Sequence, residues 1–118
     1  MKILIVDDNY SVRKMIRNLL SQAADEIFEC NDGDKVVELY SLHKPDWVLM
    51  DIKMKNMDGI KATYELKQSF PGAKVIILTN YSAEDFREDA KKAGAHEFVN
   101  KEDVLSVNTI IRNYSGQN

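Results

Sequence analysis

Five polar residues have types and positions that can do chemistry: Asp7, Asp8, Asp51, Thr79 and Lys101. Each stands directly after a short apolar run or within two residues of one. Carboxylates can hold a metal ion or act as nucleophiles, a threonine hydroxyl can donate to an oxyanion, and an ammonium can neutralise negative charge. Any one of them alone is also an ordinary loop or capping residue. Their combined meaning depends on whether the fold brings them together.

The elements that must position these residues are five short apolar runs, which we interpret as strands buried on both faces. They cover residues 2–6, 27–30, 47–50, 75–78 and 97–99. Amphipathic segments with helical spacing follow them. Their apolar stripes are Val12, Ile16, Leu19 and Ala23; Val36, Val37 and Tyr40; Ile60, Thr63, Leu66 and Phe70; Phe86, Ala90 and Ala93; and Val104, Val107 and Ile111. Ser82 suits the start of the fourth helix and Gly94 its end. The alternation predicts an α/β fold, a parallel sheet with right-handed crossover helices on both faces.

Length and composition exclude several classes of protein. The 118 residues have the size of one domain, so we expect a single domain over 1–118 with no output domain. The net charge of −3 argues against direct binding to nucleic acid or to an anionic membrane. One cysteine, Cys30, excludes a disulfide framework and a Cys-based zinc site. No membrane span or secretory leader stands out, so we expect a cytoplasmic protein.

The three aspartates predict a magnesium site. The carboxyl ends of parallel strands meet at one edge of the sheet, which is where ligands bind in open α/β folds. Asp7, Asp8 and Asp51 should therefore converge, and two carboxylates 4 Å apart repel by about 4 kcal/mol at an effective dielectric constant near 20. A bound cation is the simplest reason for a small domain to tolerate this. A few oxygen ligands with room for water favour Mg²⁺ over Ca²⁺.

A metal-bound carboxylate beside a lysine and a threonine hydroxyl is typical of a phosphoryl site. The cations would neutralise charge on the transferring group, and Thr79 would donate to a phosphoryl oxygen. One carboxylate can then serve as nucleophile and form an acyl phosphate. We assign this role to Asp51, because it ends the central strand and is followed by a loop of small and polar residues.

Ordered motifs along the whole chain, from Lys2 to about Asn113, resemble the receiver domain of two-component response regulators. The motifs are Ile-Leu-Ile-Val-Asp-Asp at 3–8, Val-Leu-Met-Asp-Ile-Lys-Met at 48–54, Met-Asp-Gly at 57–59, Ile-Ile-Leu-Thr at 76–79, Ala-Gly-Ala at 93–95 and Phe-Val-Asn-Lys at 98–101. The resemblance implies the flavodoxin-like (βα)5 three-layer sandwich, a parallel five-stranded sheet in the order 2-1-3-4-5.

The resemblance also implies a role for each site residue. Asp51 would accept a phosphoryl group from a histidine of a partner kinase or phosphotransfer protein. Asp8, Asp51 and the backbone carbonyl of Lys53 would ligate Mg²⁺, with Asp7 acting through water. Lys101 would pair with Asp51 at rest and with the phosphoryl group afterwards. The domain would catalyse only its own phosphorylation and dephosphorylation, and would not otherwise be an enzyme.

Two further residues would transmit the signal. Thr79 would swing toward the phosphoryl oxygens, and Phe98, the aromatic switch position, would turn inward into the space vacated. The face formed by the fourth helix, fifth strand and fifth helix would then change and regulate a downstream protein target or output domain. The resemblance also leaves room for a homodimer that forms on phosphorylation, and it implies no contact with a membrane.

The sequence departs from the family pattern near the site. Glu102 stands where a proline commonly follows the lysine, so we predict a trans peptide bond between Lys101 and Glu102. Lys53 and Tyr81 occupy positions that, in the family, tune the lifetime of the acyl phosphate. Lys53 would either pair with the phosphoryl group and block water or remain a solvated lysine.

Three alternatives remain to be weighed. A haloacid-dehalogenase-like phosphotransferase requires Asp-x-Asp after the first strand and a cap domain, whereas Asp7 and Asp8 are adjacent here. A nucleotide or flavin binder would have a glycine-rich loop after the first strand, which is absent from this sequence. A pseudo-receiver that acts only as a protein-binding module is opposed by the presence of all five polar residues.

Overall fold

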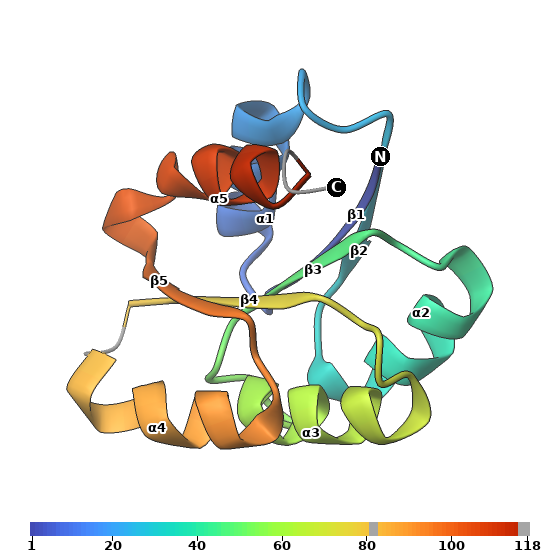
Figure 1. Ribbon diagram of the computed structural model, residues 1–118, viewed down its shortest axis with the longest axis vertical. Coiled ribbons are helices and arrows are strands. Elements are labelled where there is room, and N and C mark those ends of the chain that lie inside the picture. Colours follow the sequence, from blue (N-terminus) through green and yellow to red (C-terminus); the bar gives the residue numbers. More distant parts are fainter. Residues whose placement is uncertain (81–82, 116–118) are drawn as a thin grey trace.

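The computed structural model describes residues 1–80 and 83–115. Five parallel strands form one sheet in the order β2-β1-β3-β4-β5, as the resemblance implied (Figure 1). The strands are β1 (Lys2–Val6), β2 (Glu26–Cys30), β3 (Trp47–Met50), β4 (Val75–Thr79) and β5 (Glu97–Asn100). The helices are α1 (Tyr10–Leu20), α2 (Val36–His43), α3 (Gly59–Ser69), α4 (Ala83–Ala93) and α5 (Ser106–Ser115). Short 3₁₀ turns at Gly33–Lys35 and Lys101–Asp103 precede α2 and α5.

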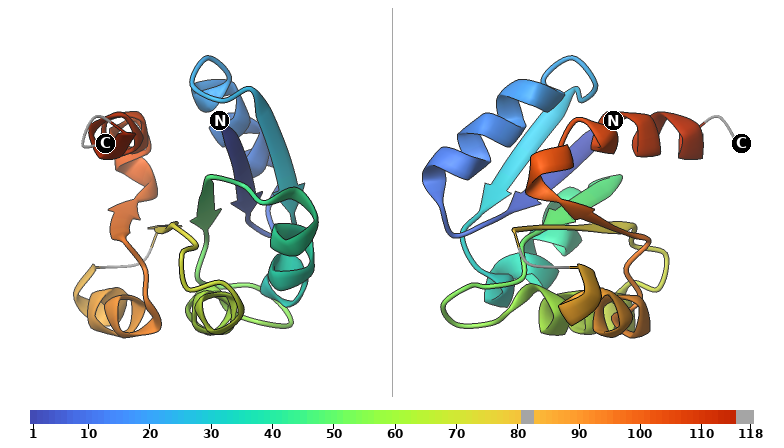
Figure 2. Two further views of the ribbon diagram at one scale, coloured as in Figure 1. Left: turned by 45° about the vertical axis from the view of Figure 1, so that its right-hand side comes forward. Right: turned by 90° about the vertical axis from the view of Figure 1, so that its left-hand side faces the viewer.

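The helices form two outer layers that cover opposite faces of the sheet, as Figures 1 and 2 show. Helices α1 and α5 contribute Ile16, Leu20, Val107 and Ile111 to the core on one face. Helices α2, α3 and α4 contribute Val36, Ala62, Leu66 and Ala90 to the core on the other. The central strands β1, β3 and β4 have almost no polar alternation because both of their faces are covered.

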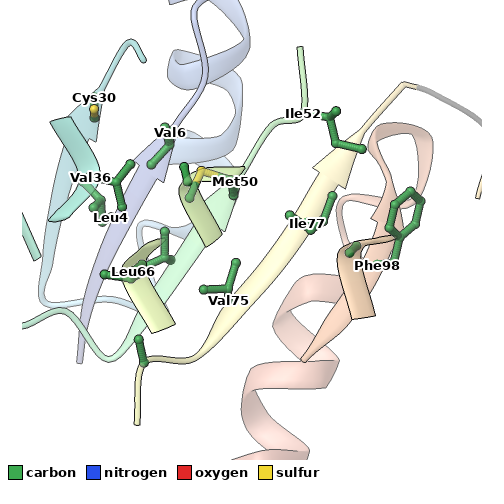
Figure 3. Packing of buried hydrophobic residues seen from close by; sticks show 14 residues of the cluster. Leu4, Val6, Cys30, Val36, Met50, Ile52, Leu66, Val75, Ile77 and Phe98 are labelled. Atoms are coloured by element: carbon green, nitrogen blue, oxygen red, sulfur yellow. The ribbon is translucent and has the colours of Figure 1, made fainter. Parts of the chain in front are cut away.

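The larger core cluster occupies the α2–α4 face and reaches the region of the predicted switch. Figure 3 shows Val6, Met50 and Ile77, from three neighbouring strands, together with Leu66 of α3. Phe98 of β5 belongs to the same cluster and is 9% exposed. A continuous layer of apolar side chains therefore links the carboxyl end of β3 to the predicted switch residue on β5.

Local signals explain where the helices begin and end. Asn9 caps α1, its side chain accepting a hydrogen bond from the Val12 amide, and Asp58 caps α3 in the same way through the Lys61 amide. Gly94 follows α4 with φ of 105°, a left-handed conformation that favours glycine, as predicted. Ser82, the predicted N-cap of α4, lies outside the described residues.

Three helix stripes extend beyond the helices that they predicted, and one of these ends at Phe70, the residue that directly follows α3. Ala23 lies past the end of α1, where the amides of Ala23 and Ala24 both donate to the Leu20 carbonyl and close the helix. Val104 is buried but follows the 3₁₀ turn Lys101–Asp103, so α5 begins two residues later than its stripe. Val104 packs on the core without being part of α5, whereas Ala23 is exposed.

An aromatic cluster occupies the opposite edge of the sheet from the aspartates. Trp47, at the start of β3, is 1% exposed and makes edge contacts with His96 and with Tyr114 of α5. The Lys74 ammonium lies 4.8 Å from the centroid of the Trp47 ring. This cluster holds the end of α5 against the amino edge of the sheet. No helix in the described part of the chain is long and apolar enough to cross a membrane.

Candidate functional site

The structure gathers the five predicted polar residues at the carboxyl edge of the sheet. Asp7 follows β1, Asp51 follows β3, Thr79 ends β4, and Lys101 follows β5 directly. The strands are in register, with Val6 opposite Met50 and Thr79 opposite Asn100. The acidic residues and the lysine are in contact with one another, which confirms the prediction that they converge.

The three aspartates form one acidic cluster. One carboxylate oxygen from each of Asp7, Asp8 and Asp51 lies within 4.8 Å of the others. Asp7 and Asp51 are 1% and 7% exposed, whereas Asp8 faces solvent. The cluster thus has a buried floor and one open side, through which a hydrated ion can enter.

Lys101 neutralises only part of this charge. Its Nζ lies 2.7 Å from Asp7 Oδ2 and 3.3 Å from Asp51 Oδ1, and its side chain is 10% exposed. Three carboxylates and one ammonium leave an excess of two negative charges, which one divalent cation balances. The donors are all carboxylate oxygens, the hard ligands that Mg²⁺ prefers. The residues present therefore fit a magnesium ion.

Burial makes the two central groups of the site electrostatically unusual. Burial, followed by the negative charge of Asp7, raises the pKa of Asp51 to about 6, against the opposing effect of Lys101. Burial alone would lower the pKa of Lys101, but its hydrogen bond to Asp7 and the charge of Asp51 outweigh this and raise its pKa. Lys101 therefore remains a cation, while Asp51 is an unusually basic carboxylate.

Backbone contacts fix the two acidic strand ends. The Asp7 amide donates to the Cys30 carbonyl, and the Asp51 amide donates to the Val6 carbonyl at 2.9 Å. Gly59, the first residue of α3, packs against the Asp51 carbonyl so closely that a Cβ at position 59 would lie 1.8 Å from that oxygen. Only glycine fits there, which explains the glycine of the Met-Asp-Gly motif at 57–59.

The predicted switch residues are both buried. Thr79 has no exposed surface, and Phe98 is 9% exposed, with Arg87 Cζ lying 5.4 Å from the centroid of its ring. We expected Phe98 to turn inward when the site is phosphorylated, and the structure already has it packed inward in the α2–α4 core cluster. Arg87, an exposed residue of α4, lies over this ring.

Lys53 lies beside the acidic cluster, but its side chain contacts α4. The Lys53 ammonium lies 5.2 Å from the centroid of the Phe86 ring, and both residues line a cavity of about 540 Å³ between the loop after β3, α3 and α4. The side chain is exposed. Tyr81, the other predicted tuning position, lies outside the described residues.

The predicted trans peptide bond between Lys101 and Glu102 is confirmed, since the described residues have no cis peptide bonds. Asn100 stabilises this turn, because its side chain accepts a hydrogen bond from the Glu102 amide at 2.9 Å. The segment after β5 is therefore held by a capped 3₁₀ turn in place of the proline found in the family pattern.

Sequence reasoning missed two residues that support the site. Asp32 accepts hydrogen bonds from the amides of Asn56 and Met57 in the loop after β3. Arg13 Nη1 donates to the Asp7 carbonyl at 2.7 Å, while its Nε pairs with Glu29. A signal for Asp32 was present, because Asn-Asp-Gly directly follows the second strand and so must lie at the same sheet edge. No comparable signal marked Arg13.

Comparisons with known proteins identify the family. Residues 3–110 match the model of the response regulator receiver domain. The chain is 41% identical over 101 residues to the chemotaxis protein CheY of Bacillus subtilis, covering 85% of this chain and 84% of that protein. It is 30% identical over 114 residues to the sporulation initiation phosphotransferase F of the same organism, covering 96% and 92% of the two chains.

A solved structure agrees in fold and in sequence. The match is to a complex of CheX and CheY with BeF3 and magnesium from Borrelia burgdorferi, with a TM-score of 0.81, 28% identity, and coverage of 94% of this chain and 89% of that one. These similarities do not favour the haloacid-dehalogenase-like phosphotransferase, the nucleotide or flavin binder, or the pseudo-receiver. The chain belongs to the response regulator receiver domain family, and is a phospho-accepting signalling switch rather than an enzyme in the usual sense.

Proposed function

We propose that Asp51 is the phosphoacceptor of this receiver domain, and that the acidic cluster holds the Mg²⁺ ion that the reaction requires. The observation that carries the proposal is the convergence of three carboxylates and one ammonium at the carboxyl edge of the sheet. Asp8, Asp51 and the backbone carbonyl of Lys53 would be the direct ligands, with Asp7 acting through water. When bound, Mg²⁺ would neutralise charge on the transferring phosphoryl group.

The residues of this chain perform the transfer as follows. An Asp51 carboxylate oxygen attacks the phosphorus of a phosphohistidine on a partner kinase or phosphotransfer protein. The new O–P bond forms as the N–P bond breaks, and the imidazole nitrogen of the partner leaves and takes up a proton. Lys101 lies 3.3 Å from Asp51 Oδ1, so it is placed to stabilise charge on the phosphoryl oxygens. The product is an acyl phosphate on Asp51.

The signal then passes from Asp51 toward β5. A phosphoryl group adds about −1.5 to −2 charges at neutral pH and strong hydrogen-bond acceptors. Thr79 and Lys101 would be drawn toward it, and Phe98 would respond through the core cluster that links β3 with β5. The face formed by α4, β5 and α5 would then change its affinity for a downstream protein target or an output domain. Formation of a homodimer on this face is part of the same proposal.

Intact-mass spectrometry after incubation with acetyl phosphate tests the proposal. Acetyl phosphate with Mg²⁺ should add one phosphoryl group to the protein, and Asp51→Asn or addition of EDTA should prevent it. Asp46→Asn is a matched control, because Asp46 is an exposed aspartate at the opposite end of the same strand. Phosphorylation of Asp51→Asn at the level of the unmodified protein would refute the assignment of the acceptor.

A further inference from the structure

Asp32 is a buried carboxylate that joins two loops beside the acidic cluster. It lies two residues after β2 and is 4% exposed. Its Oδ2 accepts a hydrogen bond from the Asn56 amide at 2.8 Å, and its Oδ1 accepts from the Met57 amide at 3.0 Å and from the Asp34 amide at 3.2 Å. Two of the three donors belong to the loop after β3, more than twenty residues further along the chain.

The position of Asp32 is itself tightly determined. Cys30 Sγ donates to the Asp32 carbonyl at 2.9 Å and fixes its backbone from the end of β2. The next residue, Gly33, meets the loop after β3 so closely that a Cβ there would lie 2.5 Å from the Met57 carbonyl oxygen. The two loops are therefore in direct backbone contact, and the carboxylate of Asp32 lies at this contact.

The loop that Asp32 holds carries a proposed metal ligand. Residues 52–58 leave β3 after Asp51 and return to α3, and the loop is closed at its base by a 2.8 Å hydrogen bond from the Gly59 amide to the Ile52 carbonyl. Asp32 holds its far side at Asn56 and Met57. The backbone of Lys53 lies between these two fixed points, so release of the far side would free its carbonyl to move.

The negative charge of Asp32 is stabilised by amides of the loop. In this respect Asp32 differs from the proposed metal ligands. Burial alone would raise the pKa of Asp32, but its hydrogen bonds to the amides of Asn56, Asp34 and Met57 outweigh this and lower the pKa. Both of its oxygens have amide donors, and it is not one of the three aspartates that converge in the acidic cluster. It nevertheless borders the same region, because Asp8 and Asp32 line one cavity of about 360 Å³.

We propose that Asp32 is a positioning residue for the magnesium site, which fastens the loop after β3 so that the Lys53 carbonyl is held ready for the ion. The inference rests on the proposed function, because it assumes that Mg²⁺ binds at Asp8, Asp51 and this carbonyl. Carboxylates that orient the ligands of a metal site without touching the metal commonly change its affinity ten- to a hundredfold when replaced. Asp32 acts here on a backbone ligand through two amide hydrogen bonds.

Asp32→Asn is the informative variant, because the amide side chain keeps the size but loses the charge and one acceptor. Titration with MgCl2, followed by NMR amide shifts, should give a dissociation constant raised about tenfold or more. In the metal-free protein, hydrogen exchange at the amides of Asn56 and Met57 should become faster. Asp46→Asn removes the same charge from an exposed residue at the opposite edge of the sheet and should change neither quantity.

A lower affinity of Asp32→Asn for Mg²⁺ could in principle follow from a general loss of stability. A second variant distinguishes this effect from release of the loop. Ile16→Val truncates the core on the α1–α5 face, away from the loop, and should lower stability without changing the affinity for Mg²⁺. The unmodified protein provides a test that does not depend on the folding of a variant. Because linkage is reciprocal, Mg²⁺ should slow hydrogen exchange at Asn56 and Met57 if the order of the loop and metal binding are coupled.

The results that would overturn the inference are specific. An Asp32→Asn variant with unchanged affinity for Mg²⁺, or with weakened affinity but fully protected Asn56 and Met57 amides, would show that Asp32 does not position the loop for the metal. Exchange at these amides that ignores Mg²⁺ in the unmodified protein would show the same. Failure of the proposed function looks different, because Asp8→Asn would then bind Mg²⁺ as well as the unmodified protein does.

Discussion

Lys101 lies closer to Asp7 than to Asp51, with Nζ to carboxylate distances of 2.7 and 3.3 Å. The lysine is therefore anchored by an aspartate that is not the proposed phosphoacceptor, and it can contact Asp51 without depending on it. This geometry lets one cation stabilise the acidic cluster at rest and remain available when the charge on Asp51 changes.

Replacing Lys101 should destabilise the metal-free protein. Lys101→Met keeps the length of the side chain but leaves the buried Asp7 and Asp51 without their cation. Breaking a buried ion pair from one side commonly costs about 3–5 kcal/mol, and protonation of Asp51 should reduce this cost at low pH. Urea denaturation in EDTA at pH 7.5 and pH 5 measures both effects. Lys92→Met, at an exposed lysine paired with Glu88, should lower stability by less than about 1 kcal/mol.

The raised pKa of Asp51 predicts a pH-dependent cost to stability. The folded-state pKa of Asp51, about 6, lies above the usual 3.8. The contribution of this carboxyl group to the free energy of unfolding is therefore fully present below pH 3.8 and is lost as the pH rises through 6. Asp51→Asn should therefore be more stable than the unmodified protein at pH 7.5 in EDTA, by an amount on the order of 3 kcal/mol.

The difference between the two proteins is the useful quantity, because Asp32 and Glu29 have lowered pKa values and act in the opposite direction in both. The gap should narrow as the pH falls from 6 toward 3.8 and close below that, where Asp51 is protonated in both the folded and the unfolded chain. Mg²⁺ should narrow it at pH 7.5 by stabilising only the protein that retains Asp51. Equal stability of the two proteins at every pH would contradict the raised pKa of the buried Asp51 carboxyl group.

Thr79→Val should separate phosphorylation from its structural response. The substitution keeps the shape of a fully buried side chain but removes the hydroxyl that would reach a phosphoryl oxygen. We expect acetyl phosphate still to modify the protein, while the NMR shift of the Phe98 ring on addition of beryllofluoride and Mg²⁺ falls by about half or more, because roughly 1–3 kcal/mol of bias is lost.

Thr63→Val is the matched control for this experiment. Thr63 is also fully buried, but its hydroxyl donates to the Gly59 carbonyl within α3, so this variant should retain the Phe98 response. An unchanged Phe98 shift in Thr79→Val would remove Thr79 from the switch.

Lys53→Ala should shorten the lifetime of the acyl phosphate. The Lys53 ammonium rests over the Phe86 ring at the rim of the site, from which it can pair with a phosphoryl group and block water. An exposed ion pair contributes about 0.2–1 kcal/mol, so dephosphorylation should accelerate by up to about fivefold. Intact mass followed over time measures the rate. Lys55→Ala alters an exposed lysine of the same loop and should leave it unchanged; an equal half-life for Lys53→Ala would favour a simply solvated lysine.

The parts of this fold that the sequence predicted are those in which local pattern and burial agree. The runs Lys2–Val6 and Trp47–Met50 are strands with the predicted bounds, because every residue in them except the half-buried Lys2 is buried between two helical layers. Strands β4 and β5 extend one residue further than predicted, since Thr79 and Asn100 pair with each other although both are polar. Hydrophobic pattern alone does not detect a polar residue that still belongs to the hydrogen-bonded sheet.

The site was predictable where topology places residues and unpredictable where side chains reach between loops. Asp7 and Asp51 follow neighbouring strands, so their convergence follows from the parallel sheet. The bond from the Asn56 amide to Asp32 joins two loops whose geometry depends on the complete fold. The contact between Arg87 and Phe98 likewise depends on how α4 packs against β5, which no spacing in the sequence determines.

The aromatic cluster around Trp47 has a practical consequence for spectroscopy. Trp47 is the single tryptophan of the chain, and the strand that separates it from Asp51 is about 13 Å long. Its fluorescence should therefore change little when ions or phosphoryl mimics bind at the opposite edge of the sheet. It should change strongly when Tyr114 moves away from Trp47 or the chain unfolds. The protein carries a built-in optical probe of its integrity that does not interfere with the measurement of its signalling state.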